Sequence, residues 1–306
     1  MLYVILLAVF RIAAFAQSPA DSVVIARASW QTTDIGQGVT WKKIHWSQKE
    51  LFNSNQSINI LETKRRNRKI RFGLASADSL TKQDKTKGQL TKTSELALRN
   101  RALAAVNGGF FDVKNGGSVD FIKINGQVID TTRGGSPTAL VFHSQAAITI
   151  HKNRVAIVKG EKKWGWENAL KADNVLLTGP LLMLNGKEET LEKTAFNTNR
   201  HPRTCACVTH DNRLLLIAVD GRTNQAYGMN LSELTFLAKQ LGCRDVINFD
   251  GGGSTTMYVA GQPDNGVVNY PCDNRLFDHA GERAVSNIFF ITSPQPRRGA
   301  PKVGSK

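Results

Sequence analysis

The sequence predicts an α+β protein in which a mixed, largely antiparallel sheet packs against helices and carries its functional loops at strand ends. Runs of alternating apolar and polar residues, separated by Asn-Gly pairs, indicate short strands joined by tight antiparallel turns. One strongly helical stretch, from Asn230 to Gly242, stands between two apolar runs. A strand, helix, strand order at this spacing indicates a crossover against the same sheet.

The first half of the chain is expected to be rich in strands. "VVIARASW", "VTWKKIHW", "INILETK" and "IRFGLAS" alternate as strands with one buried face do. A polar, lysine-rich loop is expected from 77 to 93, followed by a short helix near Ser94 and a strand that ends at Asn107. Asn-Gly turns then indicate a meander of short strands between residues 120 and 160.

The second half contains the clearest elements. "RTCACVTHDNRLLLIAVDGR" predicts a hairpin of two strands that ends at Asp220. Asn230 is a suitable N-cap with Glu233 three residues later, the leucines at 231, 234 and 241 form one stripe with Ala238, and Gly242 ends the helix. The strand "DVINFD" follows at once.

The domain organisation predicted from these patterns has four parts. A signal peptide is expected over residues 1–16, since "MLYVILLAVFRIAAFAQ" is apolar and ends in a small-x-small cleavage pattern before Gln17. A β-rich N-terminal extension over 17–90, a catalytic domain over 91–295 and a basic tail over 296–306 follow. The chain is therefore expected to be secreted or periplasmic; the alternative is an uncleaved membrane anchor, for which the apolar run is short.

The composition favours anionic partners. The 306 residues carry a net charge of +15, with much of the excess in "KRRNRK" from Lys64, in residues 82–92 and in the C-terminal tail. This charge creates a field that attracts phosphate-bearing substrates, nucleic acid or an anionic cell-envelope surface. Each basic run can also be no more than a solvated loop.

The four cysteines are too few for a disulfide framework in a chain of 306 residues. Cys205 and Cys207 are two apart in a predicted strand, so their side chains share one face and are poorly placed to pair with each other. With Cys243 and Cys272 they are expected to be buried thiols or to supply one structural disulfide. No cofactor is expected; Asp220, Asp250 and main-chain carbonyls could together hold calcium, but no ligand-spacing motif indicates a metal.

The stretch "NFDGGGSTTMY" is the strongest indication of a functional site. Asp250 lies where an apolar strand ends, and the glycines after it permit positive φ and leave backbone N–H groups uncovered. Two further strands end in "VDGR" and "NGGFFD", and "HPRT" begins another. Several strand ends with polar residues and glycine indicate a shared pocket at one edge of the sheet.

Six ordered segments together resemble the phosphodiester glycosidase family. They are "LAAVNGGFFD", "GPLLMLNGK", "RHPRTCACVT", "LLLIAVDGR", "MNLSELTFLAKQLGCRDVINFDGGGSTTMYV" and "ERAVSNIFFI", which lie within residues 94 to 292. The resemblance implies an exported hydrolase that cleaves the anomeric C–O bond of a sugar-1-phosphodiester similar to an N-acetylglucosamine-1-phosphodiester.

The chemistry of that reaction suggests roles for the residues at the strand ends. Glycoside hydrolysis normally uses two carboxyl groups, but a departing phosphomonoester needs less protonation, and cations and amides can stabilise it. Asp250 is therefore the preferred catalytic carboxylate, either as the base toward water or as the electrostatic partner of the oxocarbenium carbon. Asp220 and Glu282 are the reserve candidates for the second carboxyl role. Glu282 can instead pair with Arg283 or a strand neighbour. The expected substrate-binding residues are Asn107, Arg203, Arg222, Gly251, Gly252, Gly253, Ser254 and Thr255.

Two other classes of function compete with this prediction. A non-catalytic binder of anionic cell-envelope phosphopolysaccharide would hold the same phosphosugar without cleaving it. A nucleic-acid binder is suggested only by the basic composition, and the sequence shows no stacking array, zinc-finger or helix-turn-helix pattern.

Overall fold

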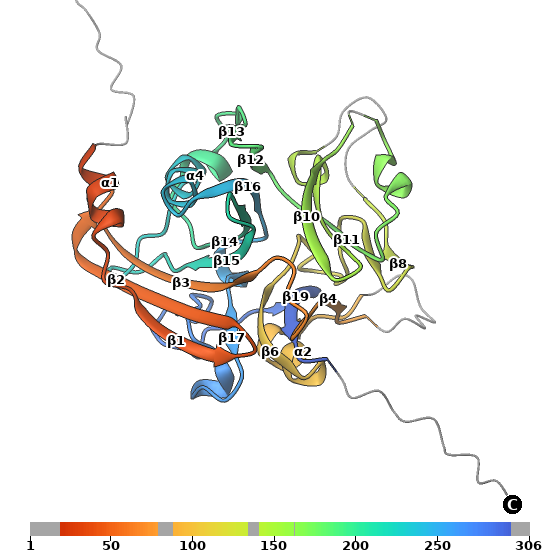
Figure 1. The fold of residues 1–306 in the computed structure, drawn as a ribbon, viewed down its shortest axis with the longest axis horizontal. Coiled ribbons are helices and arrows are strands. Elements are labelled where there is room, and N and C mark those ends of the chain that lie inside the picture. Colours follow the sequence, from red (N-terminus) through yellow and green to blue (C-terminus); the bar gives the residue numbers. More distant parts are fainter. Residues whose placement is uncertain (1–18, 79–87, 134–140, 162, 295–306) are drawn as a thin grey trace, which may run out of the picture.

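The fold is built from three main β-sheets that share one interior, with helices at the outside (Figure 1). The computed structural model describes residues 19–78, 88–133, 141–161 and 163–294. The predicted signal peptide, most of the lysine-rich loop and the basic tail lie outside these residues. The predicted α+β class is confirmed, because the sheets are mostly antiparallel and four α-helices accompany them among the described residues.

The main sheet has eight strands in the order β1-β2-β3-β15-β14-β16-β12-β13. Their bounds are Gln31–Gly36 (β1), Val39–Leu51 (β2), Ser54–Lys64 (β3), Arg213–Val219 (β15), Arg203–Thr209 (β14), Cys243–Asn248 (β16), Leu181–Leu184 (β12) and Lys187–Glu188 (β13). The predicted hairpin is confirmed as β14 and β15. Because β3 pairs directly with β15, the strands of the predicted N-terminal extension continue the same sheet.

The remaining strands form three smaller sheets. A five-stranded sheet contains β10 (Arg154–Lys159), β9 (Ala146–His151), β11 (Asn174–Leu177), β7 (Ile122–Ile124) and β8 (Gln127–Asp130). A four-stranded sheet contains β17 (Met257–Val259), β6 (Ala102–Asn107), β19 (Asn287–Thr292) and β4 (Arg71–Ser76), while β18 (Ala284–Val285) pairs with β5 (Thr91–Lys92).

The α-helices are α1 (Pro19–Ala26), α2 (Thr93–Arg99), α3 (Ala195–Thr198) and α4 (Leu231–Gln240). Short 3₁₀ turns occupy Phe142–Ser144 (η1), Trp166–Ala169 (η2), Gly252–Ser254 (η3) and Asp264–Gly266 (η4). Among the described helices, none is long and apolar enough to cross a membrane.

The main sheet is buried on both faces, as the alternation of side chains along β15 shows. Leu214 and Leu216 belong to the core shared with the two smaller sheets, whereas Leu215 and Ile217 face the core beneath α4. The strand-end residues therefore extend from a rigid, doubly covered scaffold.

Helix α4 confirms the predicted crossover. Asn230 caps it through a complete capping box with Glu233, and Leu231, Leu234 and Leu237 are fully buried. The helix connects β15 to β16, which lie on either side of β14. The chain thus returns to the sheet so that β16 ends beside the start of β14.

The strand predicted for "VVIARASW" is wrong, because residues 19–26 form helix α1. Ile25 is buried in the core beneath α4, and Val24 packs against the same cluster. The apolar run is too short to distinguish a strand from a buried helix by periodicity alone.

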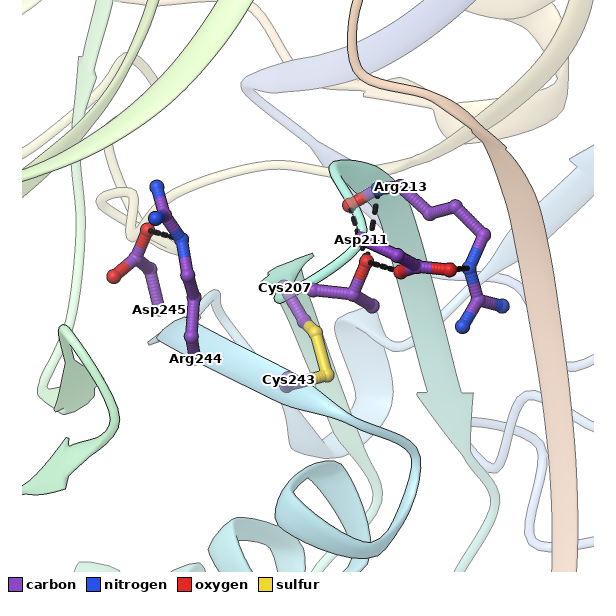
Figure 2. The surroundings of a disulfide bond; sticks show 7 residues. Cys207, Asp211, Arg213, Cys243, Arg244 and Asp245 are labelled. Carbon is purple, nitrogen blue, oxygen red and sulfur yellow. Dashed lines mark hydrogen bonds and ion pairs between the residues drawn. A yellow bond between two sulfur atoms is a disulfide. The ribbon is translucent and has the colours of Figure 1, made fainter.

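One disulfide links β14 to β16 (Figure 2). Cys207 bonds to Cys243 across a Cα–Cα distance of 5.8 Å, while Cys205 and Cys272 are buried free thiols. The sequence left open whether the cysteines would be buried thiols or form one structural disulfide, and the structure contains both. The bridge lies at the end of the strands that carries Arg244 and Asp245, opposite Asp250.

Candidate active site

Strand pairing brings the predicted site residues to one edge of the main sheet. Arg203 begins β14 and is paired with the last residue of β15, so Asp220 follows directly beside it. The Phe249 N–H donates to the Thr204 carbonyl at 2.8 Å, which places Asp250 next to Arg203 on the other side.

Asn107 joins this edge to the four-stranded sheet. Its Nδ2 donates to the Asp250 carbonyl at 2.7 Å, and its Oδ1 accepts from Thr204 Oγ1 at 2.7 Å and from the Thr256 N–H at 3.2 Å. The residue is almost fully buried. Asn107 therefore holds the site together, whereas contact of its carboxamide with ligand oxygens stays a prediction.

The glycine run is required by close packing around Asp250. The Gly252 N–H donates to the Pro202 carbonyl at 2.9 Å, and a Cβ on Gly251 would lie 2.7 Å from that same oxygen. Gly252 has φ +61° and leaves room for the Arg222 guanidinium, 2.8 Å from where a Cβ would be. The predicted anion-binding amides are thus partly engaged, since the Gly251 N–H donates to Asp250 Oδ1 at 2.9 Å.

The third glycine admits an ion pair. A Cβ on Gly253 would collide with Asp273 and with the guanidinium of Arg283, which bind each other at 2.5 Å. Arg283 therefore pairs with Asp273 rather than with its neighbour Glu282. The glycines bring two guanidinium groups, those of Arg222 and Arg283, against the turn that follows Asp250.

Asp250 has the most informative electrostatic environment. Burial raises the pKa of its carboxyl to about 6, and Ser254, the Gly251 N–H and the charges of Arg283 and Arg222 act in the opposite direction. The residue nevertheless retains part of its surface in contact with solvent. A carboxyl that titrates near neutral pH and remains accessible can exchange a proton with a bound ligand or water.

The three hydroxyls that follow share one property. The side-chain oxygens of Ser254, Thr255 and Thr256 are all buried without a hydrogen-bond partner in the described part of the chain. Ser254 also lies close enough to Asp250 to lower its pKa. Buried hydroxyls usually bond to protein or water, so these three hydroxyls lack a partner that such groups normally have.

Arg203 is fully buried. Its Nε donates to the Met229 carbonyl at 2.9 Å, and its Nη2 donates to the carbonyls of Phe196 and Asn199 at 2.6 and 3.1 Å. Burial and the charge of Arg222 lower the pKa of Arg203 to about 10. Nη1 has no hydrogen-bond partner among the described residues and is buried with the rest of the side chain.

The two reserve carboxylates are held by other protein groups. Buried Asp220 accepts from Ser57 Oγ at 2.6 Å, Asn269 Nδ2 at 2.9 Å and the Tyr270 N–H at 2.8 Å. Burial raises the pKa of Asp220, and these three hydrogen bonds lower it. These contacts anchor the end of β15 to the loop at Asn269 and Tyr270.

Glu282 faces the start of helix α2. One carboxylate oxygen accepts from the Ser94 N–H at 2.7 Å and the other from Ser94 Oγ at 2.6 Å. Lys92, at the N-cap position, supplies no side-chain hydrogen bond. Glu282 therefore caps α2 from a distant part of the sequence, and its catalytic role stays an untested prediction.

An aspartate–histidine pair that no sequence pattern reveals lies beside this edge. His143 Nδ1 lies 2.6 Å from Asp120 Oδ2, with the Asp120 side chain fully buried and that of His143 17% exposed. Burial raises the pKa of Asp120, while the hydrogen bond and charge of His143 lower it. Neither residue belongs to a spacing motif, so only the folded contact reveals the pair.

Aromatic rings connect this pair to the strand-end residues. The Phe110 ring centroid lies 5.0 Å from that of His143 and 6.0 Å from that of Phe196, and the Arg203 guanidinium lies 4.8 Å from the Phe196 centroid. Phe142, 5.0 Å from Phe196, is 37% exposed. Since the Asp250 N–H donates to the Gly108 carbonyl at 3.0 Å, the loop that carries Phe110 also contacts Asp250.

A cavity of about 390 Å³ adjoins the Asp220 side of this region. Ser57 and Tyr270, which both bond to Asp220, line it, whereas Asp250, Arg203 and Arg222 do not. Over the described ranges, no group of three or more His, Cys, Asp or Glu residues is arranged to hold a metal ion.

Comparisons with known proteins identify the family. The family model for phosphodiester glycosidases matches residues 100–292, more than half of the chain, so the protein belongs to the phosphodiester glycosidase family. That segment contains all the predicted catalytic residues and both members of the Asp120–His143 pair.

Two curated proteins and one solved structure illustrate the relationship. The bovine (Bos taurus) N-acetylglucosamine-1-phosphodiester alpha-N-acetylglucosaminidase is 31% identical over 199 residues, 59% of this chain and 34% of that protein. The SPbeta prophage-derived uncharacterized protein YomE of Bacillus subtilis (strain 168) is 26% identical over 210 residues, 65% of this chain and 29% of that protein. The catalytic domain of the zebrafish N-acetylglucosamine-1-phosphodiester alpha-N-acetylglucosaminidase shares the fold, with a TM-score of 0.64, 19% identity, and 87% and 88% of the two chains covered.

The match is thus to a part of each curated relative. This chain spans about a third or less of their length. What the family shows for this protein is a phosphodiester glycosidase domain.

Proposed function

We propose that this protein is an exported hydrolase that cleaves the bond between the anomeric carbon and the phosphate oxygen of a sugar-1-phosphodiester, with N-acetylglucosamine-1-phosphodiesters as the first substrates to test. Water adds to the anomeric carbon, the C–O bond breaks and the phosphate monoester leaves with the bonding electron pair. The water proton passes to a protein base. Family membership supports this reaction class, and the activity for which the bovine relative is named supports the choice of sugar.

The observation that carries the proposal is the environment of Asp250. A carboxyl with a pKa of about 6 is ionised at neutral pH and can accept the proton of the attacking water. In the same ionised form it can stabilise positive charge on the anomeric carbon.

Positive groups near Asp250 suit a departing phosphate. Arg222 is exposed, and both Arg222 and Arg283 are close enough to lower the pKa of Asp250. Guanidinium groups bind phosphate oxygens well and stabilise charge that develops as the bond breaks. Within this proposal Arg222 is the principal phosphate ligand.

His143 is the proposed proton donor to the leaving oxygen. Asp120 occupies Nδ1, which leaves Nε2 as the nitrogen available to a ligand, and a buried carboxylate stabilises the protonated imidazole. This arrangement would supply the acid function for which the sequence offered Asp220 and Glu282. The partly exposed rings of Phe110 and Phe142 offer an apolar surface for one face of the sugar.

Export is a separate part of the proposal. The predicted leader over residues 1–16 supports it, as does the disulfide, since such bonds persist mainly in oxidising compartments. Detection of the mature chain with an N-terminus near Gln17 outside the cytoplasm would establish it.

The decisive experiment follows free sugar released from a panel of sugar-1-phosphodiesters by the wild type, Asp250→Asn and Arg222→Ala. We expect release by the wild type, a loss of turnover of about 100-fold or more for Asp250→Asn, and a raised KM for Arg222→Ala. Asp34→Asn, an exposed hairpin position, is the matched control. Calorimetric binding without release of sugar from any substrate would instead favour the non-catalytic phosphopolysaccharide binder.

A further inference from the structure

A second hollow, remote from Asp250, is lined by positive charge. It has a volume of about 580 Å³ and lies between the β3–β4 connection and the turn from β9 to β10. Four cations, Arg66, Arg68, Arg71 and Lys152, line it together with one carboxylate, Asp173. We call this feature the basic hollow.

The two sides of the basic hollow are fixed to each other by one side chain. Asn153 Nδ2 donates to the carbonyls of Asn67 and Ile70 at 3.1 and 2.9 Å, and Asn153 Oδ1 accepts from the Phe72 N–H at 3.0 Å. The β9–β10 turn is therefore bonded directly to the segment that carries the arginines. The cations therefore lie on a surface whose two segments are held together by hydrogen bonds.

The positive charges of the basic hollow are largely uncompensated. In the described parts of the chain, Arg66, Arg68 and Lys152 have no ion pair, and each is exposed. Arg71 donates to the main-chain carbonyls of Arg68 and Ile70 at 3.3 and 2.9 Å. Asp173 is the only carboxylate among the described lining residues, so it can offset only one of the four positive charges.

More cations stand at the same end of the main sheet. The pKa of Arg65 is lowered by burial and by the charges of Arg154 and Arg244. Arg65, Arg154 and Arg244 thus lie close enough to repel one another, and Arg244 also pairs with Asp245 at 3.1 Å (Figure 2). A cluster of positive charges attracts anions and raises their encounter rate.

The chemistry of the lining favours a phosphate chain over nucleic acid. Phe72 is the only aromatic residue of the basic hollow, and it is only 6% exposed. Binding of single-stranded nucleic acid depends on stacking of bases on exposed rings as well as on a positive groove. The basic hollow provides the positive groove but no exposed ring on which a base could stack.

The basic hollow lies far from the active-site edge. Ser57 of β3 bonds to Asp220 at the active-site edge, whereas Lys64, seven residues later, ends β3 beside Arg65. At about 3.3 Å per residue, the two ends are about 23 Å apart. A small phosphodiester at Asp250 cannot reach the basic hollow, but a polymer of several repeats can.

We propose that the basic hollow binds a segment of a linear phosphodiester polymer. Its guanidinium and ammonium groups hold successive phosphates away from the catalytic edge. This inference goes beyond the proposed hydrolysis and does not depend on it, because binding is measured without turnover.

The test uses fluorescently labelled poly(glycerol phosphate) and the full mature chain. Arg68→Gln/Lys152→Gln removes one cation from each side of the basic hollow, and we expect affinity to fall about tenfold. The slope of log affinity against log salt should become shallower by about 1.4, if each lost phosphate contact contributes about 0.7. Arg27→Gln/Lys114→Gln removes the same charge from exposed positions elsewhere and should change affinity less than about twofold.

Three results would overturn the inference. They are no measurable binding of poly(glycerol phosphate) by the wild type, equal losses in the two double variants, or tighter binding of a base-containing single-stranded DNA of equal charge. Because hydrolysis of a small sugar-1-phosphodiester is assayed separately, a failure of the proposed reaction leaves each of these results interpretable.

Discussion

Folding stability and catalysis favour different protonation states of the Asp250 carboxyl. Its burial favours the neutral acid, whereas a base must be ionised, and a pKa of about 6 places the transition just below neutral pH. We predict that kcat/KM falls about tenfold for each pH unit below 6 as the carboxylate is protonated. A pH profile of the wild type measures this, and a flat profile between pH 5 and 7 would exclude Asp250 as the base.

The same conflict predicts that Asp250→Asn stabilises the folded protein. The folded pKa is about 6 and the unfolded value about 3.9, so the ionised carboxyl destabilises the fold as pH rises between these values. The variant should gain up to about 3 kcal/mol at pH 7.5, and the gain should disappear below about pH 4. Urea unfolding at both pH values provides the measurement. A variant less stable than the wild type at pH 7.5 would contradict the burial argument.

The Asp120–His143 pair makes a distinct prediction about proton transfer. His143→Gln should lower kcat by about 100-fold on a sugar-1-phosphodiester whose departing phosphate monoester is basic, and much less on one whose departing phosphate monoester carries an electron-withdrawing group and is weakly basic. Asp120→Asn should show the same dependence on leaving group, because Asp120 orients the imidazole. Equal losses on both substrates would assign the pair a structural role.

Residue identity at the strand ends was predictable from the sequence, but the contacts were not. Asp250 and its glycines stand out because glycine residues commonly mark the turn at the end of a strand. That Arg203 is buried beneath Phe196, or that Asn107 bonds to Thr204, depends on pairing between strands far apart in sequence. His143 has no pattern around it at all.

At the scale of elements, Glu282 and helix α2 form a testable unit. The helix has no local side-chain cap, and Glu282 binds both the N–H and the hydroxyl of Ser94. We predict that Glu282→Ala lowers the free energy of unfolding by about 1–2 kcal/mol, the usual worth of a cap, while kcat stays within a factor of three.

Thermal unfolding and sugar-release assays on the same preparation distinguish the two possible roles of Glu282. Glu282→Gln, which keeps an acceptor for Ser94, should recover part of the lost stability. A large loss of kcat in Glu282→Gln with unchanged stability would instead make Glu282 a catalytic carboxylate.

The elements differ in how well local sequence specifies them. Helix α4 was predictable because a capping box, a leucine stripe and a terminal glycine all agree. Helix α1 was not, since its eight residues depend on burial of Ile25 against the core beneath α4. The turn at Asn125-Gly126 was predictable because both residues take the positive φ that a tight hairpin requires.

At the scale of the whole molecule, the assembly of the sheets could not be derived from local pattern. β3 pairs with β15, so segments about 150 residues apart lie side by side in the main sheet. β12 pairs with β16, whereas β11, only three residues before β12, belongs to the five-stranded sheet. Such choices depend on which apolar faces can be buried together, which the sequence of a single strand does not reveal.

The disulfide makes the final prediction, because it ties together the strands that present the active site. Cys207 and Cys243 are separated by 36 residues that include β15 and α4, and loop closure of that length is worth about 4 kcal/mol in the chain-entropy model. Cys207→Ala/Cys243→Ala should therefore lose about 2–4 kcal/mol of unfolding free energy, and reductant should bring the wild type to the same level. Cys205→Ala, which removes a buried free thiol from the same strand, is the control and should not respond to reductant beyond the wild type. If the double variant loses no more stability than this control, the bridge does not constrain the chain, and the active-site edge is held by packing and strand pairing alone.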